Sequence, residues 1–391
     1  MKIAQRIQNV QESLTLALTA KAKAMQAEGI DVIGFGAGEP DFDTPDPIKQ
    51  RAMAELAAGN TKYAPASGTP ALKKAVAEKL KRDQGLDYDP AQVIINCGAK
   101  HSIHNAVLAL VEEGDEVIIP APYWLSYPEM VTIAGGKSVY IEAGVERDFK
   151  ITPEQLEAAI GPRTRAFILN SPSNPTGMVY ERAELEALGA VLERHPEVAI
   201  ISDEIYEKMV YDGVEHVSMA QLSPALKQQT LLVNGLSKAY SMTGWRLGYM
   251  AGPADVIKAV GRLQSHTTSN PVSFAMPAAI TALNECEDQV RQMVAAFAER
   301  RVVMTGLLNK IPGVRCPEPK GAFYVFPDVS ETFGRLGVKD AVEFSSRLLD
   351  EARVSVVPGE PFGDNNCIRL SYATSLENIN KGLERLADFL K

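Results

Sequence analysis

Short apolar runs alternate with amphipathic stretches along the first two thirds of the chain. Between about residues 30 and 250 the runs are VIGFG, QVIINC, EVIIP, SVYIE, AFILN, AIISDE, TLLVNG and LGYMAG. Runs of this length that end in turn-forming residues predict buried strands, and stretches such as PALKKAVAEKLKRD and RAELEALGAVLERH predict helices between them. Strands that alternate with helices favour an α/β fold with a mainly parallel sheet covered on both faces.

The pattern changes after about residue 285. A long amphipathic helix is predicted over residues 288–308, followed by the apolar run GAFYVF, another helix, and the runs VSVVPG and CIRLSYA. This order is typical of a smaller α+β unit, which we expect the N-terminal helix to join. We therefore predict a large α/β domain over residues 45–284 and a small domain made of residues 1–44 and 285–391.

Composition and charge narrow the class of protein. The chain has 391 residues, of which 46% are hydrophobic, enough for a sizeable core and more than one domain. A formal charge of −9 argues against binding to nucleic acid or to an anionic membrane. No run approaches the ~20 apolar residues of a membrane helix, and the N-terminal segment lacks the apolar stretch of a signal peptide. A cytoplasmic enzyme with no membrane or nucleic-acid partner is the expectation.

Polar side chains follow the ends of several predicted strands. In open α/β sheets, ligands bind beyond the carboxyl ends of the strands, so residues there should converge on one cleft. The residues in question are Gly98, Ala99 and Lys100 after QVIINC, Trp124 after EVIIP, Asn174 after AFILN, Asp203 and Tyr206 after AIIS, and Lys238 after TLLVNG.

Two of these groups suit a phosphorylated aromatic ligand. Backbone N–H groups at residues 98–100 precede a predicted helix, and helix starts bind phosphate. Arg246 can add charge-assisted hydrogen bonds to the same phosphate. Asp203 can hold a ring nitrogen in its protonated form, which makes the ring an acceptor of electrons.

The remaining groups complete the ligand. Asn174 and Tyr206 can donate hydrogen bonds to a ring oxygen, and Trp124 can cover a ring face. Lys238 can form an imine with an aldehyde, and its segment contains no acidic residue that would hold the amine protonated. A phosphate, a protonatable ring nitrogen, a ring hydroxyl and an aldehyde together describe pyridoxal 5′-phosphate.

Each of these residues alone also has a purely structural interpretation. Asp203 could cap a helix, the sequence NPTG is a good turn, Trp124 could be a core residue, and a lone lysine such as Lys238 is usually a surface residue. Arg369 is different, because an arginine in the middle of the apolar run CIRLSYA needs an anionic partner. The order of the whole set along the chain favours the cofactor.

Three other ligand motifs fail. GFGAGEP lacks the spacing of a dinucleotide-binding loop, and GGKS has Val131 where a phosphate-binding loop needs glycine. Cys97, His101 and His104 have no carboxylate to complete a metal site, so no metal is predicted.

The motifs SPSNPTG, SDEIYE and SKAYSMTGWRLGY, in this order, resemble the class I aminotransferases that depend on pyridoxal phosphate and have fold type I. AGEPDFDTP, KYAPASGTPALKKAV, PYWLSYPEM, GAFYVF and IRLSYATS extend the resemblance over essentially the whole chain. Within the family, the chain is most similar to the bacterial aspartate aminotransferases of the subgroup found also in thermophiles and plant plastids. The resemblance implies a mainly parallel seven-stranded sheet in the large domain, and a homodimer.

The resemblance also implies residue roles. Lys238 would form the imine and carry the proton, and the residues already assigned to the phosphate, ring nitrogen, ring oxygen and ring face would keep those tasks. Tyr63 would reach the phosphate of the neighbouring subunit. Arg369 and the backbone of Gly38 would bind the α-carboxylate of the substrate, with Trp124 and Asn174 also in contact with it.

The substrate prediction depends on Lys100. Relatives of this subgroup use a lysine at this position for a second carboxylate, with help from hydroxyl residues that correspond to Ser13 and Thr15. A cation at a helix start is disfavoured unless an anion is near, so a dicarboxylic substrate is favoured. Two departures are Ser173, where many relatives have Asn, and the lack of an assignable arginine for the distal carboxylate.

The function predicted from the sequence is transfer of the amino group between L-aspartate and 2-oxoglutarate. The alternatives are a glutamate/aspartate–prephenate aminotransferase, another class I aminotransferase acting on aromatic amino acids, and a pyridoxal phosphate-dependent β-lyase. A regulator built on this fold would carry an added DNA-binding module, which the negative charge disfavours.

Overall fold

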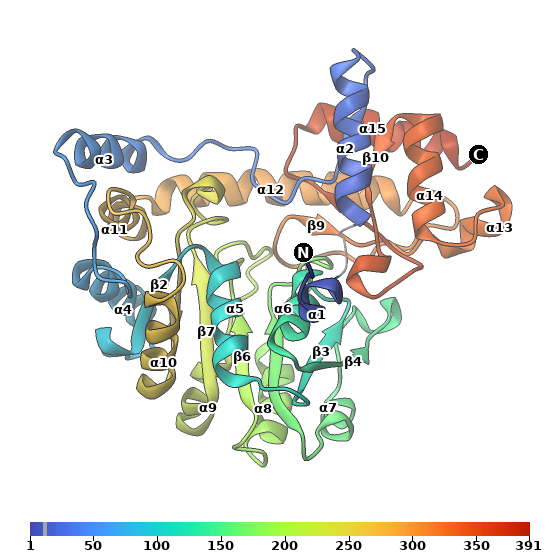
Figure 1. The fold of residues 1–391 in the computed structure, drawn as a ribbon. Helices are drawn as coiled ribbons and strands as arrows, with labels where there is room; N and C mark the ends of the chain where they lie inside the picture. The colour runs from blue at the N-terminus through green and yellow to red at the C-terminus, as the bar shows by residue number, and fades with distance from the viewer. Residues whose placement is uncertain (11–13) are drawn as a thin grey trace.

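A computed structural model describes residues 1–10 and 14–391. Its centre is a seven-stranded sheet in the order β2-β8-β7-β6-β5-β3-β4, with neighbouring strands parallel except at β8, which is antiparallel to β2 and β7 (Figure 1). The predicted mainly parallel seven-stranded sheet is confirmed. The strands are β2 (Val93–Asn96), β3 (Glu116–Ala121), β4 (Lys137–Glu142), β5 (Thr164–Asn170), β6 (Ala199–Asp203), β7 (Thr230–Gly235) and β8 (Gly248–Ala251).

Both faces of this sheet are covered by helices. Successive residues of its strands point to opposite faces and pack in different hydrophobic cores. Ile168 and Ile201 pack in one core, whereas their neighbours Phe167 and Ile200 pack in another. The first face is covered by α5 (Ala99–Leu110), α6 (Ser126–Ala134) and α10 (Ala254–Ser265). The other is covered by α4 (Pro70–Gln84), α7 (Pro153–Ala159), α8 (Arg182–Leu192), α9 (Pro224–Gln229) and α11 (Ala275–Glu285). Helix α3 (Asp46–Ala57) packs on α11.

A second group of elements lies above the sheet in Figure 1. The long helix α12 runs between the two groups and contacts α11 and α15. It begins within one residue of the predicted start, whereas GAFYVF contributes only the two-residue strand β9. This group contains α2 (Leu14–Ala27), α12 (Glu287–Leu308), α13 (Phe333–Leu336), α14 (Ala341–Arg347) and α15 (Leu376–Phe389). Its strands are β1 (Ile33–Gly34), paired with β10 (Val354–Ser355), and the set β11 (Val357–Pro358), β12 (Ile368–Ser371) and β9 (Tyr324–Val325). The short helix α1 (Gln5–Gln8) instead lies against α6.

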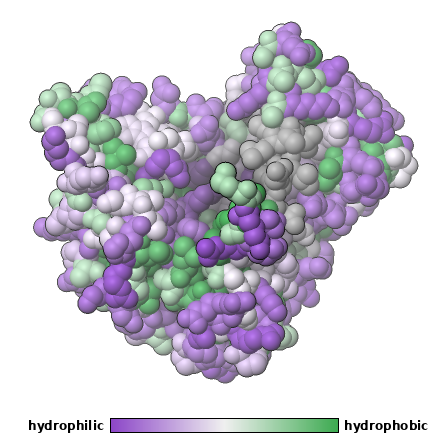
Figure 2. Space-filling model, in the orientation of Figure 1, coloured by the Kyte–Doolittle hydropathy of each residue, from purple (hydrophilic) through white to green (hydrophobic). Residues whose placement is uncertain are grey.

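The space-filling view shows two lobes with a notch between them at the top of the molecule (Figure 2). The predicted domain limits at residues 44/45 and 284/285 stay a prediction. Within residues 1–10 and 14–391, no helix combines the length and apolar composition that crossing a membrane would require.

Local sequence explains why the helices begin and end where they do. The hydroxyl of Thr69 accepts a hydrogen bond from the backbone N–H of Leu72, and Pro70 occupies the first position of α4. Gly85 ends that helix in the left-handed conformation. These signals set the two ends of α4, which contacts β2. Its last residue, Gln84, donates a hydrogen bond to Glu204, just beyond the end of β6.

Candidate active site

A pocket of about 660 Å³ lies beyond the carboxyl ends of the parallel strands, with walls from both groups of elements. It brings together most of the residues predicted from the strand ends, together with Arg369 of β12 from the other lobe. The predicted residues that line it are Gly38, Ala99, Lys100, Trp124, Asn174, Asp203, Tyr206, Lys238, Arg246 and Arg369.

Lys238 follows the end of β7 and points into the pocket. Its Nζ donates a hydrogen bond to the carbonyl oxygen of Gly38 and lies 5.9 Å from the ring centre of Tyr206. Burial, followed by the positive charge of Arg369, lowers the pKa of Lys238 from 10.5 to about 8. An amine with this pKa is neutral in a useful fraction of molecules near physiological pH, as a nucleophile or proton acceptor must be.

Asp203 is the last residue of β6 and is only 4% exposed. The hydroxyl of Tyr127 donates to its Oδ2 at 2.6 Å, and the N–H of Ile205 donates to its Oδ1 at 3.3 Å. Burial and the nearby charge of Glu204 raise the pKa of Asp203 to about 6, against the effect of these two hydrogen bonds. Among the described residues no cation forms an ion pair with this carboxylate, so it is available to a protonated nitrogen of a ligand.

Gly98 and Arg246 shape the end of the pocket at the start of α5. Gly98 has φ of +88°, and a Cβ at this position would lie 2.6 Å from Nη2 of Arg246. Only glycine therefore lets the guanidinium lie against this turn. Arg246 donates to the carbonyl oxygens of Thr243 at 2.9 Å and Cys97 at 3.4 Å, and the first N–H groups of α5 have no acceptor inside the helix. The arrangement suits a phosphate.

Arg369 lies at the opposite side of the pocket, 6% exposed. Its Nη1 donates to Oδ1 of Asn174 at 2.9 Å, and its Nη2 donates to the carbonyl oxygen of Gly36 at 3.2 Å. Nε is buried, with no hydrogen-bond partner among the described residues. Since the guanidinium has only neutral acceptors, an anionic ligand would complete its environment.

Lys100 and Trp124 form the rim of the pocket. Lys100 is exposed, and its Nζ lies 4.9 Å from the ring centre of Trp124. Partial loss of hydration and the positive charge of Arg246 lower the pKa of Lys100. The two nearby cations would be stabilised by an anion between them.

The structure does not bring every predicted residue into the pocket. Tyr63 is 94% exposed and does not line it. Gly98 shapes the turn but is not part of the pocket wall. Ser13 lies outside the described residues, as does the side chain of Thr15.

Sequence reasoning missed two tyrosines of the site. Tyr127 binds Asp203, and the hydroxyl of Tyr324 lies 3.0 Å from that of Tyr206. Both are buried in apolar surroundings, and a buried tyrosine hydroxyl needs a polar partner. Tyr324 in the run GAFYVF carried this signal, but the sequence alone did not say which partner it would meet.

The expected absence of a metal site rested partly on Cys97 and His101. The backbone N–H of Cys97 donates to Nδ1 of His101 at 3.2 Å, so this histidine completes the turn before α5. A different group of possible ligands, Glu204, Glu207 and His216, lies behind β6.

Comparison with known proteins gives the family. The sequence model described as "Aminotransferase class I and II" matches residues 30–386. The chain belongs to this family. The resemblance seen in the motifs is confirmed, and the protein is an aminotransferase.

Full-length relatives of this aminotransferase are also known. It is 53% identical to an aspartate aminotransferase of Geobacillus stearothermophilus, covering 100% of this chain and 99% of the relative. It is 51% identical to an aspartate/prephenate aminotransferase of Cereibacter sphaeroides, covering 97% and 96%. Among solved structures, this aminotransferase matches the aspartate aminotransferase of Rhizobium meliloti with a TM-score of 0.97, 46% identity and coverage of 100% and 99%. The enzyme of Thermus thermophilus with maleate gives a TM-score of 0.94, 43% identity and 99% coverage of both chains.

Proposed function

We propose that this aminotransferase transfers the amino group between L-aspartate and 2-oxoglutarate, giving oxaloacetate and L-glutamate, with pyridoxal 5′-phosphate as cofactor. The observation that carries the proposal is Arg369, a buried cation that has no carboxylate partner among the residues the structure describes, in the same pocket as Lys238 and Asp203. The names of full-length relatives at 50–53% identity agree with it.

The residues present fit the cofactor. The first turn of α5 and Arg246 would hold its phosphate, and Asp203 its ring nitrogen. Asn174 and Tyr206 would bind the ring oxygen, and Trp124 would cover the ring. Asp203 supports this fit, because it is buried and forms no ion pair among the described residues, and a buried carboxylate favours a cationic partner. When bound, the cofactor supplies an electron sink for the electron pair of the substrate Cα–H bond.

The chain's own groups would then orient the substrate and move its proton. Arg369, with the backbone of Gly38, would bind the α-carboxylate, and Lys100 the distal carboxylate of aspartate or glutamate. When both carboxylates of the substrate are held, its Cα has a single position, beside Lys238. The Nζ of Lys238 then takes the proton from Cα. The finding of maleate, itself a dicarboxylate, with the Thermus thermophilus enzyme agrees with a site for two carboxylates.

Visible absorbance of the cofactor-loaded protein tests the function. Addition of L-aspartate alone should convert the cofactor to its amine form, and 2-oxoglutarate should restore the original band. A protein that binds the cofactor but does not respond to aspartate would contradict the substrate and leave the cofactor assignment standing. Release of ammonia and pyruvate without an acceptor would instead indicate a β-lyase.

A second candidate is the same reaction with prephenate as the amino acceptor. Relatives at 48–51% identity are named aspartate/prephenate aminotransferases. Prephenate also carries two carboxylates, and Lys100 lies at the exposed rim, where a longer substrate can be accommodated. If prephenate is an amino acceptor, its addition in place of 2-oxoglutarate should restore the original absorbance band of the cofactor.

We also propose a cytoplasmic homodimer, in which Tyr63 reaches the phosphate site of the neighbouring subunit. Its support is a hollow lined by Met53, Leu56, Trp245, Val272 and Phe274, several of which are exposed apolar residues. In Figure 2, green atoms gather at the upper left, where α3 lies. Sedimentation should show twice the chain mass, and Tyr63→Phe should weaken cofactor binding while leaving the dimer intact.

A further inference from the structure

A buried network of amide side chains joins α10, the end of β2 and the first turns of α5, three elements that lie side by side in Figure 1. Its centre is Gln264, near the end of α10, which is 0% exposed. Asn96, Ser102 and Asn105, which complete the network, are at most 1% exposed. Polar groups withdrawn from water to this extent are stable only when they are hydrogen-bonded.

The Gln264 amide uses all of its hydrogen-bonding positions. Nε2 donates to the carbonyl oxygens of Ala66 at 2.6 Å and Ile95 at 2.8 Å. Oε1 accepts from the side-chain amides of Asn96 at 2.6 Å and Asn105 at 3.4 Å. Since backbone carbonyls can only accept, the two ends of the amide cannot exchange places, and the orientation of Gln264 is fixed.

One branch of the network holds the turn that we propose to bind the cofactor phosphate. Oδ1 of Asn96 accepts a hydrogen bond from the hydroxyl of Ser102 at 2.8 Å, across this turn. The N–H of Gly98 donates to the carbonyl oxygen of Asn96 at 2.8 Å, and the N–H of Ser102 donates to that of Gly98 at 3.2 Å. Gln264 thus fixes the side chain of Asn96, and Asn96 fixes both ends of the turn that carries the free N–H groups of α5.

The other branch holds the segment that carries Tyr63. Besides the hydrogen bond that Ala66 receives, the carbonyl oxygen of Ser67 accepts one from the N–H of Ile95 at 3.0 Å. Gly68 has φ of +95°, and a Cβ there would lie 2.3 Å from a side-chain carbon of Ile95, so the segment lies directly against β2. The side chain of Tyr63 is itself exposed, so its position depends on how the residues after it are held.

We propose that Gln264 is a positioning residue for phosphate binding in both subunits of the dimer. Through Asn96 it fixes the phosphate turn of its own chain, and through Ala66 it fixes the segment whose Tyr63 serves the neighbouring site. A network in which every partner is satisfied holds one geometry, and donors that converge on a phosphate must keep their spacing. This inference rests on the proposed cofactor and on the proposed homodimer.

The first test compares two ligands that differ in the phosphate group. Pyridoxal 5′-phosphate and pyridoxal share the ring and the aldehyde, so the ratio of their dissociation constants, compared with the ratio in the wild type, isolates the phosphate. Gln264→Leu keeps the approximate volume of the side chain and removes its hydrogen bonds. Affinity for pyridoxal 5′-phosphate should fall roughly 10- to 100-fold, as expected when one or two charge-assisted hydrogen bonds are misplaced, and affinity for pyridoxal by less than about threefold.

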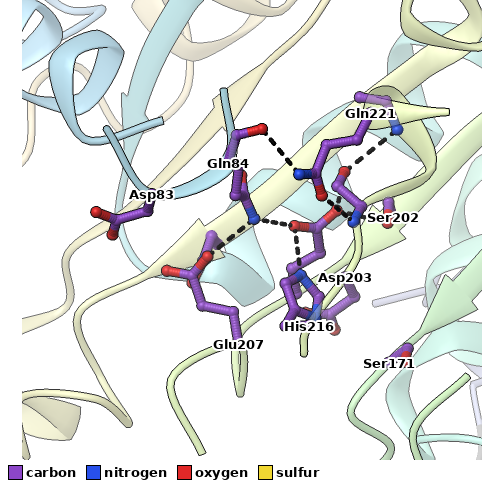
Figure 3. Close-up of polar contacts among 12 residues, drawn as sticks. Asp83, Gln84, Ser171, Ser202, Asp203, Glu207, His216 and Gln221 are labelled. Atoms are coloured by element: carbon purple, nitrogen blue, oxygen red, sulfur yellow. Dashed lines mark hydrogen bonds and ion pairs between the residues drawn. The ribbon is translucent and has the colours of Figure 1, made fainter. Parts of the chain in front are cut away.

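Gln221→Leu is the matched control. The amide of Gln221 also joins two backbone segments, donating to the carbonyl oxygen of Gln84 at 2.8 Å and accepting from the N–H of Ser218 at 2.6 Å (Figure 3). Its partners lie at the end of α4 and just before its own turn, so this variant should unfold at lower urea and keep the wild-type ratio of dissociation constants. An equal loss of affinity for both ligands in Gln264→Leu, or the wild-type ratio, would overturn the proposal.

Ser102→Ala covers the case in which Gln264→Leu does not fold. This variant removes only the hydroxyl that binds Asn96 and leaves the segment of Tyr63 in place. Affinity for pyridoxal 5′-phosphate should fall about three- to tenfold, the effect of one hydrogen bond, and affinity for pyridoxal should stay the same. The wild-type ratio in Ser102→Ala would contradict the branch through Asn96.

Hybrid dimers test the role in the neighbouring subunit. In a dimer of one Lys238→Ala/Gln264→Leu chain and one wild-type chain, only the wild-type chain can bind the cofactor through its lysine, and visible absorbance reports that site alone. Its own turn is intact, whereas its Tyr63 comes from the variant chain. Its affinity for pyridoxal 5′-phosphate should be lower than in a hybrid whose first chain carries Lys238→Ala alone.

The possible failures of these experiments are distinguishable. Equal affinity in the two hybrids would overturn the role of Gln264 in the neighbouring subunit. A wild-type protein that does not bind pyridoxal 5′-phosphate would instead refute the proposed function, and a monomeric wild type would refute the proposed dimer.

Discussion

Two lysines of this protein are withdrawn from solvent but have opposite surroundings. Lys79 in α4 is 1% exposed and is paired with Glu207 and Asp83, whose charges outweigh burial and raise its pKa. Lys238 donates only to a backbone carbonyl, and burial lowers its pKa to about 8. Within the part of the chain that the structure describes, the first lysine thus has a counter-ion and the second forms no ion pair.

Two buried arginines show the same contrast. Arg301 is 1% exposed and binds both oxygens of Asp212 at 2.8 Å, with Glu318 at 3.2 Å. Among residues 1–10 and 14–391, Arg369 has only an amide oxygen and a carbonyl oxygen as acceptors. Because an unpaired buried charge lowers stability, such a group is tolerated where a ligand completes it. Charges paired inside the protein indicate structure, and charges left unpaired around the pocket indicate function.

The strongest test of this contrast is Lys238→Ala. Transamination should fall by at least about 10⁴-fold, because the variant lacks both the amine that binds the cofactor and the group that moves the proton. The free energy of unfolding of the cofactor-free protein should stay the same or rise, since a poorly solvated cation is removed. Enzyme assays and urea unfolding check the two expectations, and normal activity in this variant would refute the proposed function.

Lys79→Met should have the reverse pattern. The variant leaves Glu207 buried without its cation, and loss of one partner of a buried pair lowers the free energy of unfolding by about 3–5 kcal/mol. Denaturant unfolding measures this loss. The double variant Lys79→Met/Glu207→Leu should recover much of it, and a Lys79→Met protein as stable as the wild type would show that the pair is not structural.

Arg369→Gln should act on substrate binding. Loss of charge-assisted hydrogen bonds to the α-carboxylate is worth about 2–3 kcal/mol, or roughly 30- to 150-fold in kcat/KM. Stability should change little, whereas Arg301→Gln should destabilise the fold and leave KM nearly unchanged. Equal loss of stability in the two variants would contradict the contrast between the arginines.

The buried carboxylate of Asp203 makes a prediction about pH. Its pKa is about 6 in the folded protein and 3.8 when unperturbed, so the folded state binds this proton more tightly. The contribution of Asp203 to stability is therefore fully present below about pH 4 and is lost as the pH rises through 6. In the cofactor-free protein, Asp203→Asn should be more stable than the wild type by about 1–3 kcal/mol at pH 7, and the difference should shrink toward pH 4. Thermal unfolding from pH 4 to 8 measures it. A wild type that is the more stable protein at pH 7 would contradict the assignment.

The smallest effect is expected at the exposed rim. Lys100→Ala should lower kcat/KM for aspartate and glutamate about tenfold, and for phenylalanine less, because only the dicarboxylic substrates carry a distal charge. An equal loss for all three amino acids would mean that Lys100 serves the cofactor phosphate alone.

The sheet and much of the pocket could be predicted because their signals are local. Apolar runs of the right length gave the strands, and the residues after each run had to meet at one edge. Asp203, Lys238 and Asn174 were found in this way. The antiparallel direction of β8 could not be predicted, because the run LGYMAG has the same pattern of apolar residues as a parallel strand.

Interactions between distant parts of the chain escaped prediction. The pairs Lys79–Glu207 and Tyr127–Asp203 join residues 128 and 76 positions apart. No periodicity in the sequence reports such a pair, because its geometry depends on how the sheet is assembled. Tyr63 is a further case, because it is 94% exposed and the role proposed for it lies in a neighbouring subunit, which the chain alone does not contain.

The side chains of successive residues at the end of β6 alternate in direction, and this alternation limits how the length of the strand can vary. Asp203 and Glu204 differ by one methylene, but the pleat sends them to opposite sides of the sheet. A deletion of one codon within the strand would shift the register by one residue, placing the longer acid of Glu204 at the pocket position of Asp203 and moving Asp203 to the position of Ser202, on the other side of the sheet. In a library of variants with single-residue insertions or deletions, no functional variant should carry such a change within β6, even at positions where point substitutions are tolerated.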